Sequence, residues 1–308
     1  MKEKKYKLSE STLEWNGHIL HRIVSVSTFK LINGDIVNSG DEGGWVESEG
    51  NLSQEYSCWV DSEAKVYGNA MVFDHALISN HAEVFDDAKV HSSVRVYGSA
   101  KVFGEAEVRD YAIITEAALV YDKAFIYENA RIRGNAEVFG ESAISGNAMI
   151  SGRAKVYGYV TVYGNAQVFG DVCVYDEACI HGYAQIFGDA QVYGSATISN
   201  YAYVCGKTKI HGCLCIDGPA DIKGDAEITS NEDFIVFRNH FSSGRWFTWT
   251  RSNDMWKVGC FYGTGKGLIE KAYKDSDLKG KYYESYVQLV EKFKQIGHNE
   301  EKREALQD

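Results

Sequence analysis

The sequence predicts a mainly β protein: a solenoid of stacked parallel strands, with a β cap before it and a small α+β module after it. Three observations predict this fold class. A six-residue phrase repeats through more than half of the 308 residues, turn signals precede it, and aromatic-rich runs with helical patterns follow it. A repeat at a fixed short period is the usual signature of such an architecture. The predicted divisions are residues 1–63, 64–231 and 232–308.

The N-terminal segment contains two turn signals between apolar runs. Asn16-Gly17 and Asn33-Gly34 each interrupt a strand-like stretch, and an Asn-Gly pair in this context is a strong hairpin signal. A solenoid leaves unpaired strand edges at its ends, which proteins normally cover. Residues 1–63 are therefore expected to cap the solenoid.

The repeat itself begins at Ala64 and continues as 28 consecutive hexads to Asn231. The third position is Val or Ile in all 28, the first is Ala in 22, and the fifth is Gly in 17 with Asp or Asn in seven more. The first and third positions lie on one side of a strand, so we expect both to point inward. The fifth position must tolerate positive φ, so each hexad should end in a turn. Three hexads would close a triangular coil, giving about nine coils in all.

The fourth position supports a coil of three hexads, because it is aromatic eight times in succession when every third hexad is read. A triangular coil would place these rings on one outer face. There they would either stack as a stabilising ladder or form an apolar stripe that marks an interface. We favour the interface and expect a homo-oligomer. The residues concerned are Tyr67, Phe85, Phe103, Tyr121, Phe139, Tyr157, Tyr175 and Tyr193.

Residues 232–308 change character. Strand-like aromatic runs surround a turn signal at 252–254, and helical patterns follow around 268–274 and 281–296. In the second pattern, apolar residues recur at helical spacing, so one face is expected to pack on the module. The residues of that face are Tyr283, Tyr286, Val287, Val290 and Phe293.

The same module contains a candidate ligand site. Aromatic rings there could stack on a base or a side chain, and nearby cations could hold an anion. Residues 263–267, GTGKG, lie between a predicted strand and a predicted helix, where backbone N–H groups can face a phosphate or carboxylate. Alternatively, the tryptophans form the core of the module. The candidate site comprises Arg245, Trp249, Arg251, Trp256, Tyr262, Thr264 and Lys266.

Charge and cysteine content argue against several classes of protein. The net charge is −11, and residues 1–231 hold 19 Lys and Arg against 31 Asp and Glu, so we expect no direct binding to nucleic acid or to a membrane. The seven cysteines include no CxxC pair, so neither a disulfide framework nor a metal site is predicted. The N-terminus has no apolar signal core, and no run is long enough to span a bilayer. A cytoplasmic protein is expected.

The hexads resemble the left-handed parallel β-helix of hexapeptide-repeat proteins, with Val66 and Ala70 at that family's aliphatic-to-small spacing. The segments at 43–46, 52–53 and 58–59 (GGWV, LS and CW) are similar to the initial segment of the YdcK-type proteins of bacteria and phages. This resemblance covers roughly residues 6–231. The MWKVGCFYGTG stretch near the C-terminus is also similar to a segment of related phage proteins. A cyclic trimer is the oligomer that the resemblance implies.

The best-known use of this helix is acyl transfer, and the resemblance implies that such an enzyme would add a catalytic His and loops that leave the coil. No loop interrupts the 28 hexads here. The sequence therefore favours a non-catalytic binding or scaffold protein that needs no cofactor. The phage-like resemblance implies counter-defence, by binding a host protein or an anionic, nucleotide-like signal. An acyltransferase-like enzyme and an acidic mimic of nucleic acid are the alternatives.

Overall fold

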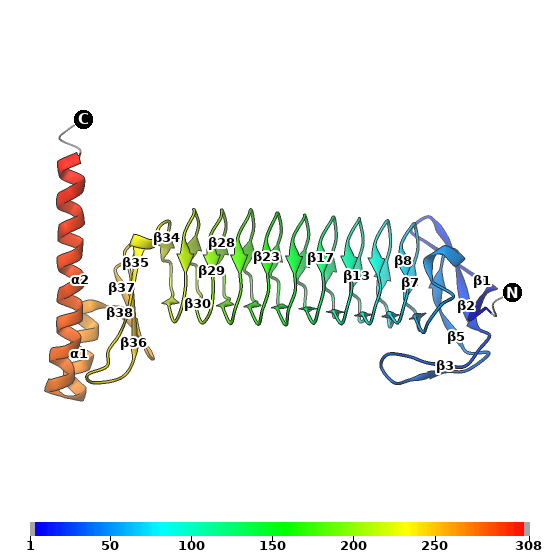
Figure 1. Cartoon of the computed structure of the whole chain (residues 1–308), viewed down its shortest axis with the longest axis horizontal. Coiled ribbons are helices and arrows are strands. Elements are labelled where there is room, and N and C mark those ends of the chain that lie inside the picture. The colour runs from blue at the N-terminus through cyan, green and yellow to red at the C-terminus, as the bar shows by residue number, and fades with distance from the viewer. Residues whose placement is uncertain (1–3, 305–308) are drawn as a thin grey trace.

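The computed structural model describes residues 4–304, with side chains described up to residue 296. It is a mainly β parallel solenoid of about ten turns. Antiparallel strands extend one end, and a small module of antiparallel strands and helices covers the other (Figure 1). The fold class predicted from the sequence is confirmed.

Each hexad forms a two-residue strand from its second and third positions, as at Lys65–Val66. All 28 third-position Val and Ile side chains are at most 1% exposed, and the first-position residues, mostly Ala, are buried beside them. Strands three hexads apart pair in parallel register, so that Val66 lies beside Val84 and Val84 beside Val102. The inward pattern expected from the sequence is therefore correct.

The strands form three sheets along the solenoid. The 13-stranded sheet runs β1 (Tyr6–Trp15), β2 (His18–Ser25), β5 (Glu42–Val46), β7 (Lys65–Val66), β10 (Glu83–Val84), β13 (Lys101–Val102), β16 (Leu119–Val120), β19 (Glu137–Val138), β22 (Lys155–Val156), β25 (Cys173–Val174), β28 (Gln191–Val192), β31 (Lys209–Ile210) and β34 (Glu227–Ile228).

The nine-stranded sheet consists of β8 (Met71–Val72), β11 (Lys89–Val90), β14 (Glu107–Val108), β17 (Phe125–Ile126), β20 (Ala143–Ile144), β23 (Thr161–Val162), β26 (Cys179–Ile180), β29 (Thr197–Ile198) and β32 (Cys215–Ile216). The ten-stranded sheet consists of β6 (Trp59–Val60), β9 (Leu77–Ile78), β12 (Arg95–Val96), β15 (Ile113–Ile114), β18 (Arg131–Ile132), β21 (Met149–Ile150), β24 (Gln167–Val168), β27 (Gln185–Ile186), β30 (Tyr203–Val204) and β33 (Asp221–Ile222).

The corners have positive φ at every fifth hexad position from Gly68 to Gly224, including Asp, Asn, Ser and Glu residues. Several of the acidic corner residues make an additional bond between coils. The carboxylate of Asp86 accepts from the Gly104 amide at 3.2 Å, and that of Asp122 accepts from the Gly140 amide at 3.2 Å. This bond offsets part of the backbone strain that a non-glycine residue incurs in the left-handed region.

Both predicted N-terminal hairpins are present. β1 and β2 are joined at Asn16-Gly17, and the short strands β3 (Phe29–Lys30) and β4 (Ile36–Val37) are joined around Gly34. A 3-10 turn, η1 (Glu49–Asn51), follows β5.

Parallel pairing begins before the first hexad at Ala64. Val46 lies beside Val66, Leu52 beside Val72, and Val60 beside Ile78. The last pair keeps the three-hexad spacing of the repeat, whereas the partners in the first two pairs are two positions further apart in the chain. The first coil therefore has two extra residues between Leu52 and Val60, which conceal the repeat in the sequence.

The C-terminal module begins with a second 3-10 turn, η2 (Asn231–Asp233). Its antiparallel sheet follows the order β35 (Phe234–Arg238), β36 (Trp246–Thr250), β37 (Met255–Val258) and β38 (Phe261–Thr264). Helices α1 (Gly265–Asp275) and α2 (Asp277–Glu304) pack on the side of this sheet away from the solenoid (Figure 1). The predicted turn and both predicted helical segments are present.

Candidate functional site

The aromatic column on the 13-stranded sheet is a continuous stack. Neighbouring rings from Tyr67 to Tyr193 lie 4.7–5.3 Å apart between centroids, with interplanar angles of at most 8°. His211 adds a further ring at 4.6 Å from Tyr193. We call this stack, Tyr67 to Tyr193, the aromatic ladder.

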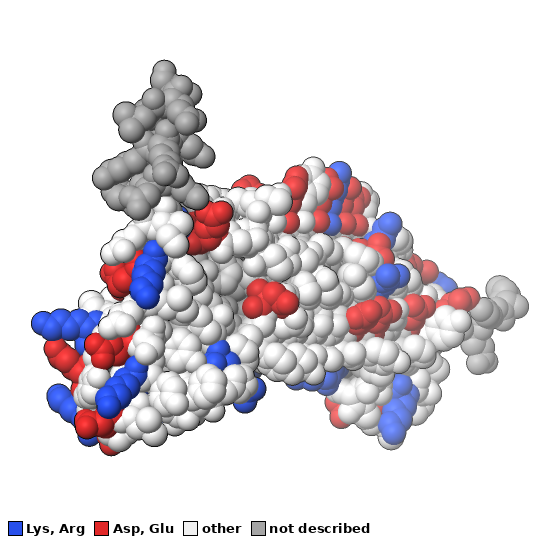
Figure 2. Space-filling model, turned by 60° about the vertical axis from the view of Figure 1, so that its left-hand side comes forward, with Lys and Arg blue, Asp and Glu red and all other residues white. Residues whose placement is uncertain are grey.

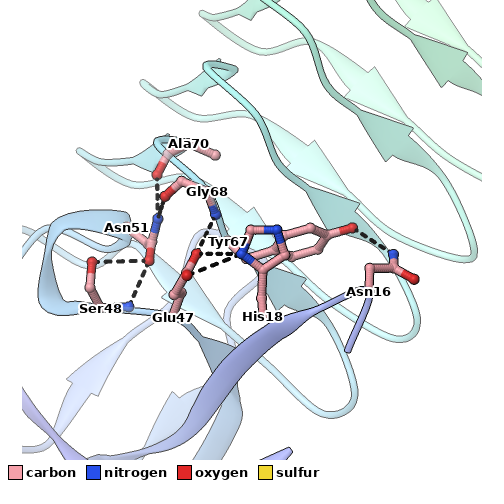
Figure 3. Close-up of polar contacts among 8 residues, drawn as sticks. All are labelled: Asn16, His18, Glu47, Ser48, Asn51, Tyr67, Gly68 and Ala70. Atoms are coloured by element: carbon pink, nitrogen blue, oxygen red, sulfur yellow. Dashed lines mark hydrogen bonds and ion pairs between the residues drawn. The ribbon is translucent and has the colours of Figure 1, made fainter. Parts of the chain in front are cut away.

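The N-terminal hairpin covers the first ring of the ladder (Figure 3). The Asn16 amide donates to the Tyr67 hydroxyl at 3.2 Å, and the His18 ring lies 5.0 Å from the Tyr67 ring. Trp15 donates to the Glu83 carboxylate at 3.0 Å, and the Tyr67 hydroxyl donates to the same carboxylate. Burial, more than the neighbouring carboxylate, raises the pKa of Tyr67 to about 12. This ring is therefore a structural contact of the cap.

Beside that contact, Glu47 connects the cap to the first corner of the repeat (Figure 3). Its carboxylate lies 3.0 Å from the His18 imidazole and accepts from the Gly68 amide at 2.7 Å. The His18 hydrogen bond lowers the pKa of Glu47 from its ordinary value. The Asn51 side chain donates to the carbonyls of Gly68 and Ala70 at the same corner, at 2.9 Å each. The cap thus reproduces, with side chains, bonds that a preceding coil would supply.

Along the rest of the ladder the rings from Phe85 to Tyr193 are half-buried. Each ring covers the face of the next, and the ring edges face outward. Stacking of this kind contributes about 0.5–1.5 kcal/mol for each pair. The geometry fully accounts for the ladder as a stabilising feature, and the oligomer interface stays a prediction.

The C-terminal ligand site needs a correction. Trp249 is 2% exposed and Trp256 is 1% exposed, and both lie in the core of the module with Phe247. The alternative interpretation, that the tryptophans form the core, is correct for these two residues. Because adjacent strands β36 and β37 pair Trp249 with Trp256, both rings face the helices and neither can stack on a ligand.

The other residues of the candidate ligand site are exposed but have different surroundings. Lys266 lies 4.0 Å from Glu270, and the Thr264 hydroxyl accepts from the Gly267 amide as the N-cap of α1. Arg245 lines a small hollow with Phe261 and Lys271. Tyr262 donates to the carbonyl of Lys223 at 3.1 Å, on the last coil. The amide of Arg251 donates to the Asp233 carbonyl at 2.7 Å.

Side chains of the module and of η2 satisfy the strand edges at the end of the solenoid. The amide of Asp221 on β33 donates to the Thr248 hydroxyl at 3.0 Å, and that of Glu227 on β34 donates to the Ser252 hydroxyl at 2.8 Å. The amide of Cys215 on β32 donates to the Asn231 side chain at 3.1 Å. All three sheets thus end on a side-chain acceptor. This arrangement closes the edge without adding another β-strand.

Strand β35 divides its side chains between the two parts of the molecule. Phe234 and Val236 pack against the core of the solenoid, whereas Ile235 and Phe237 pack against the core of the module. This period of two follows from the alternation of side chains along a strand. The inner face of β35 therefore packs on the solenoid.

One side of α2 carries large apolar side chains that are exposed rather than packed on the module. Leu289 is 40% exposed, Phe293 46% and Ile296 57%, and Leu278 extends the row at 63%. We call these four residues the α2 stripe. Phe293 was expected on the packed face, but Tyr283, Val287 and Val290 fill that face. Helical positions 289, 293 and 296 share one side, a pattern that could have been found in the sequence.

Within the described residues, no group of three or more His, Cys, Asp or Glu side chains could hold a metal ion. Neither described helix combines the length and apolar character needed to cross a membrane. No protein-family model matches the chain, and a search of curated proteins finds no match.

Proposed function

We propose that the chain is a non-catalytic binding or scaffold protein in which a rigid solenoid holds a recognition module at its end. The α2 stripe is the observation that carries this proposal. It consists of Leu278, Leu289, Phe293 and Ile296, all exposed on α2, and α2 lies on the side of the module away from the solenoid (Figure 1). Exposed apolar rows of this kind mark protein interaction sites.

The chemistry of the stripe favours a protein partner over a small anion. A helix that presents apolar anchors three and four residues apart fits an apolar groove or a second helix. Charged residues of both signs adjoin it on α2, where Glu291 and Lys292 are exposed beside Phe293. Figure 2 shows blue and red side chains interspersed on the module at the front of that view. Such a mixed rim suits a protein surface.

Resemblance refines this proposal. The hexad pattern supports a left-handed, hexapeptide-repeat β-helix of the YdcK-like type, and the similarity to phage proteins supports a host protein as the partner. Binding to that protein would then serve counter-defence in the cytoplasm of a bacterial host. The aromatic ladder supports a homo-oligomer, with a trimer favoured by the family resemblance. Each of these refinements is part of the proposal.

The test compares two double variants of the full-length protein. Leu289→Glu with Phe293→Glu changes the α2 stripe, and Tyr183→Glu with Tyr201→Glu changes two rings on the solenoid that are 53% and 67% exposed. A host protein captured by the wild type is purified and titrated against all three by calorimetry. We expect the α2 variant to weaken binding by about tenfold or more, which is about 1.4 kcal/mol, and the solenoid variant to bind as the wild type does.

Three results would overturn the proposal. Equal binding by the wild type and the α2 variant would place the partner elsewhere. Binding of mononucleotides or cyclic oligonucleotides that is lost in Arg251→Ala and Lys266→Ala would favour the nucleotide-like signal. Turnover of an acyl donor, or displacement of the partner by duplex DNA, would favour the acyltransferase or the nucleic-acid mimic.

A further inference from the structure

The residue directly before β1 is a buried lysine in contact with a buried cysteine. Lys5 is 6% exposed and Cys58 is 0% exposed. The Lys5 ammonium nitrogen lies 3.1 Å from the Cys58 Sγ and donates to the Cys58 carbonyl oxygen at 2.7 Å. The two residues are 53 positions apart in the chain. Cys58 belongs to the irregular part of the first coil, where the two extra residues lie.

The protonation of this pair leaves a nucleophile in either arrangement. Burial lowers the pKa of Lys5 and raises the pKa of Cys58, and each group opposes the shift of the other. An ammonium beside a thiolate and an amine beside a thiol hold the same number of protons and the same net charge. Proton transfer between the sulfur and the nitrogen interconverts these two arrangements, and each of them contains one unprotonated group. Thiolates and neutral amines are the reactive forms of these groups.

A surface hollow reaches the Lys5 side of the pair, although Cys58 itself does not line it. A surface hollow of about 270 Å³ is lined by Lys4, Lys5, Ser27, Phe29, Gln54 and Tyr56. Lys5 thus connects the buried sulfur with a hollow many times larger than a water molecule. Hydrogen peroxide is close to water in size, so it fits this hollow.

We propose that Lys5 and Cys58 are an oxidation site, at which a peroxide converts the contact into a covalent sulfur–nitrogen cross-link. In the ammonium–thiolate arrangement, the Cys58 thiolate attacks one peroxide oxygen, the O–O bond breaks, and the sulfur becomes a sulfenic acid. The second oxygen leaves as water with a proton from the Lys5 ammonium, which becomes a neutral amine. The Lys5 amine then attacks this sulfur, the S–N bond forms, and the S–O bond breaks to release a second water. The sulfur loses two electrons overall, and one peroxide is reduced to two waters.

The cross-link would fasten the first strand to the first coil. Lys5 leads into β1, which forms the outer edge of the 13-stranded sheet. A covalent bond across 53 positions removes conformational freedom from the unfolded chain, as a disulfide of that span does. Sulfenic acids condense with nitrogen in this way in other proteins, and thiols reverse the bond. The pair is then a redox-sensitive staple of the N-terminal cap.

The test uses the full-length protein with its three exposed cysteines, Cys213, Cys215 and Cys260, replaced by serine. The protein is treated with hydrogen peroxide, digested and analysed by mass spectrometry. We expect a linked pair of peptides containing Lys5 and Cys58, lighter by two hydrogens than their sum, which dithiothreitol separates. The linked protein should also unfold at a higher denaturant concentration than the reduced protein.

Two variants serve as controls. Lys5→Arg keeps the positive charge but removes the amine, and Cys58→Ser removes the sulfur, so neither should give the linked peptides or the shift in unfolding. Sulfenic or sulfinic acid at Cys58 with an unmodified Lys5 would overturn the proposal. An unchanged Cys58, or a link that retains an oxygen atom between nitrogen and sulfur, would overturn it as well.

Discussion

The solenoid and the C-terminal module bury their apolar residues by different means. In the solenoid, one short rule is repeated: a small residue and a β-branched residue point inward in each hexad, and each makes the same contacts as its counterpart three hexads away. In the module, the core is formed by single large side chains such as Phe247 and Trp256, each with its own surroundings. A repeated rule can be read from the sequence, whereas a unique core depends on tertiary contacts.

The two regions also divide the work of the protein. The solenoid carries its charges and rings in ordered rows, and its length separates the two ends (Figure 1). The module uses one face to close the solenoid, and the α2 stripe stays exposed. Regular repetition provides rigidity, and the irregular end provides a distinctive surface.

The largest effect is expected from breaking the repeat. One residue inserted after Gly164 would turn the inward side chains of every later coil outward, because side chains alternate along a strand. We expect loss of cooperative unfolding by circular dichroism and rapid proteolysis after residue 164. Duplication of residues 154–171, a whole coil, is the matched control. It keeps every column in register, so a stable and longer solenoid should result, and unfolding of this control would contradict the coil length.

A smaller effect is expected from the aromatic ladder. Replacing Phe103, Tyr121 and Phe139 with Ser removes four stacked contacts. At about 0.5–1.5 kcal/mol for each pair, stability should fall by about 2–6 kcal/mol. Denaturant titration measures this loss. If the ladder is also the predicted interface, the mass in light scattering should fall to that of one chain. A wild type that is already monomeric would remove the interface and leave the stack.

A smaller loss of stability is expected when the docked face of the module is changed. Thr248→Val combined with Ser252→Ala removes the acceptors for the amides of Asp221 and Glu227. The Asp221 amide is partly buried, so leaving it unsatisfied should cost about 1–3 kcal/mol. The Glu227 amide is exposed, so water can replace its acceptor and its loss should add little. Thr161→Val is the matched control, because this threonine is exposed on a central coil. Equal stability of the two variants would indicate that water replaces the lost acceptors.

The smallest effect is expected from pH at the opposite end. The pKa of Glu47 is lowered in the folded protein, so its contribution to stability is present above the ordinary carboxyl value of 4.5. That contribution is lost as the pH falls through the lower, folded value. Because Glu47 is one-third exposed, the effect should stay below about 1 kcal/mol. In denaturant titrations at pH 5 and below, Glu47→Gln should flatten the slope of stability against pH. If the slope is unchanged in Glu47→Gln, the loss of stability at low pH comes from other carboxylates.

Much of the solenoid could be predicted because its signal repeats. The inward Val and Ile residues and the positive φ at the corners were both expected from a single hexad. The hydrogen bond that the Gly104 amide donates to the Asp86 carboxylate was not expected, since it exists only after two coils have stacked. The first coil was missed for a simpler reason. Two extra residues between Leu52 and Val60 break the six-residue spacing.

The candidate sites were harder to predict. Aromatic and cationic residues around Trp249 resembled a ligand site, but the alternation of β36 turns that ring toward the helices. Similarly, Phe293 belongs to an apolar pattern on α2, and only the packing of Val287 and Val290 determines which side of the helix is buried. Sequence patterns locate apolar faces, whereas tertiary contacts decide which face remains free.

The central structural claim is that the module closes the open strand edges at the end of the solenoid with one face. Residue-resolved hydrogen exchange on the full-length protein tests it most directly. The amides of Asp221 and Glu227, bonded to module side chains, should exchange as slowly as the interior amide of Lys209, which donates to the Ala226 carbonyl. Rapid exchange at Asp221 and Glu227 with slow exchange at Lys209 would show an open edge and contradict the account.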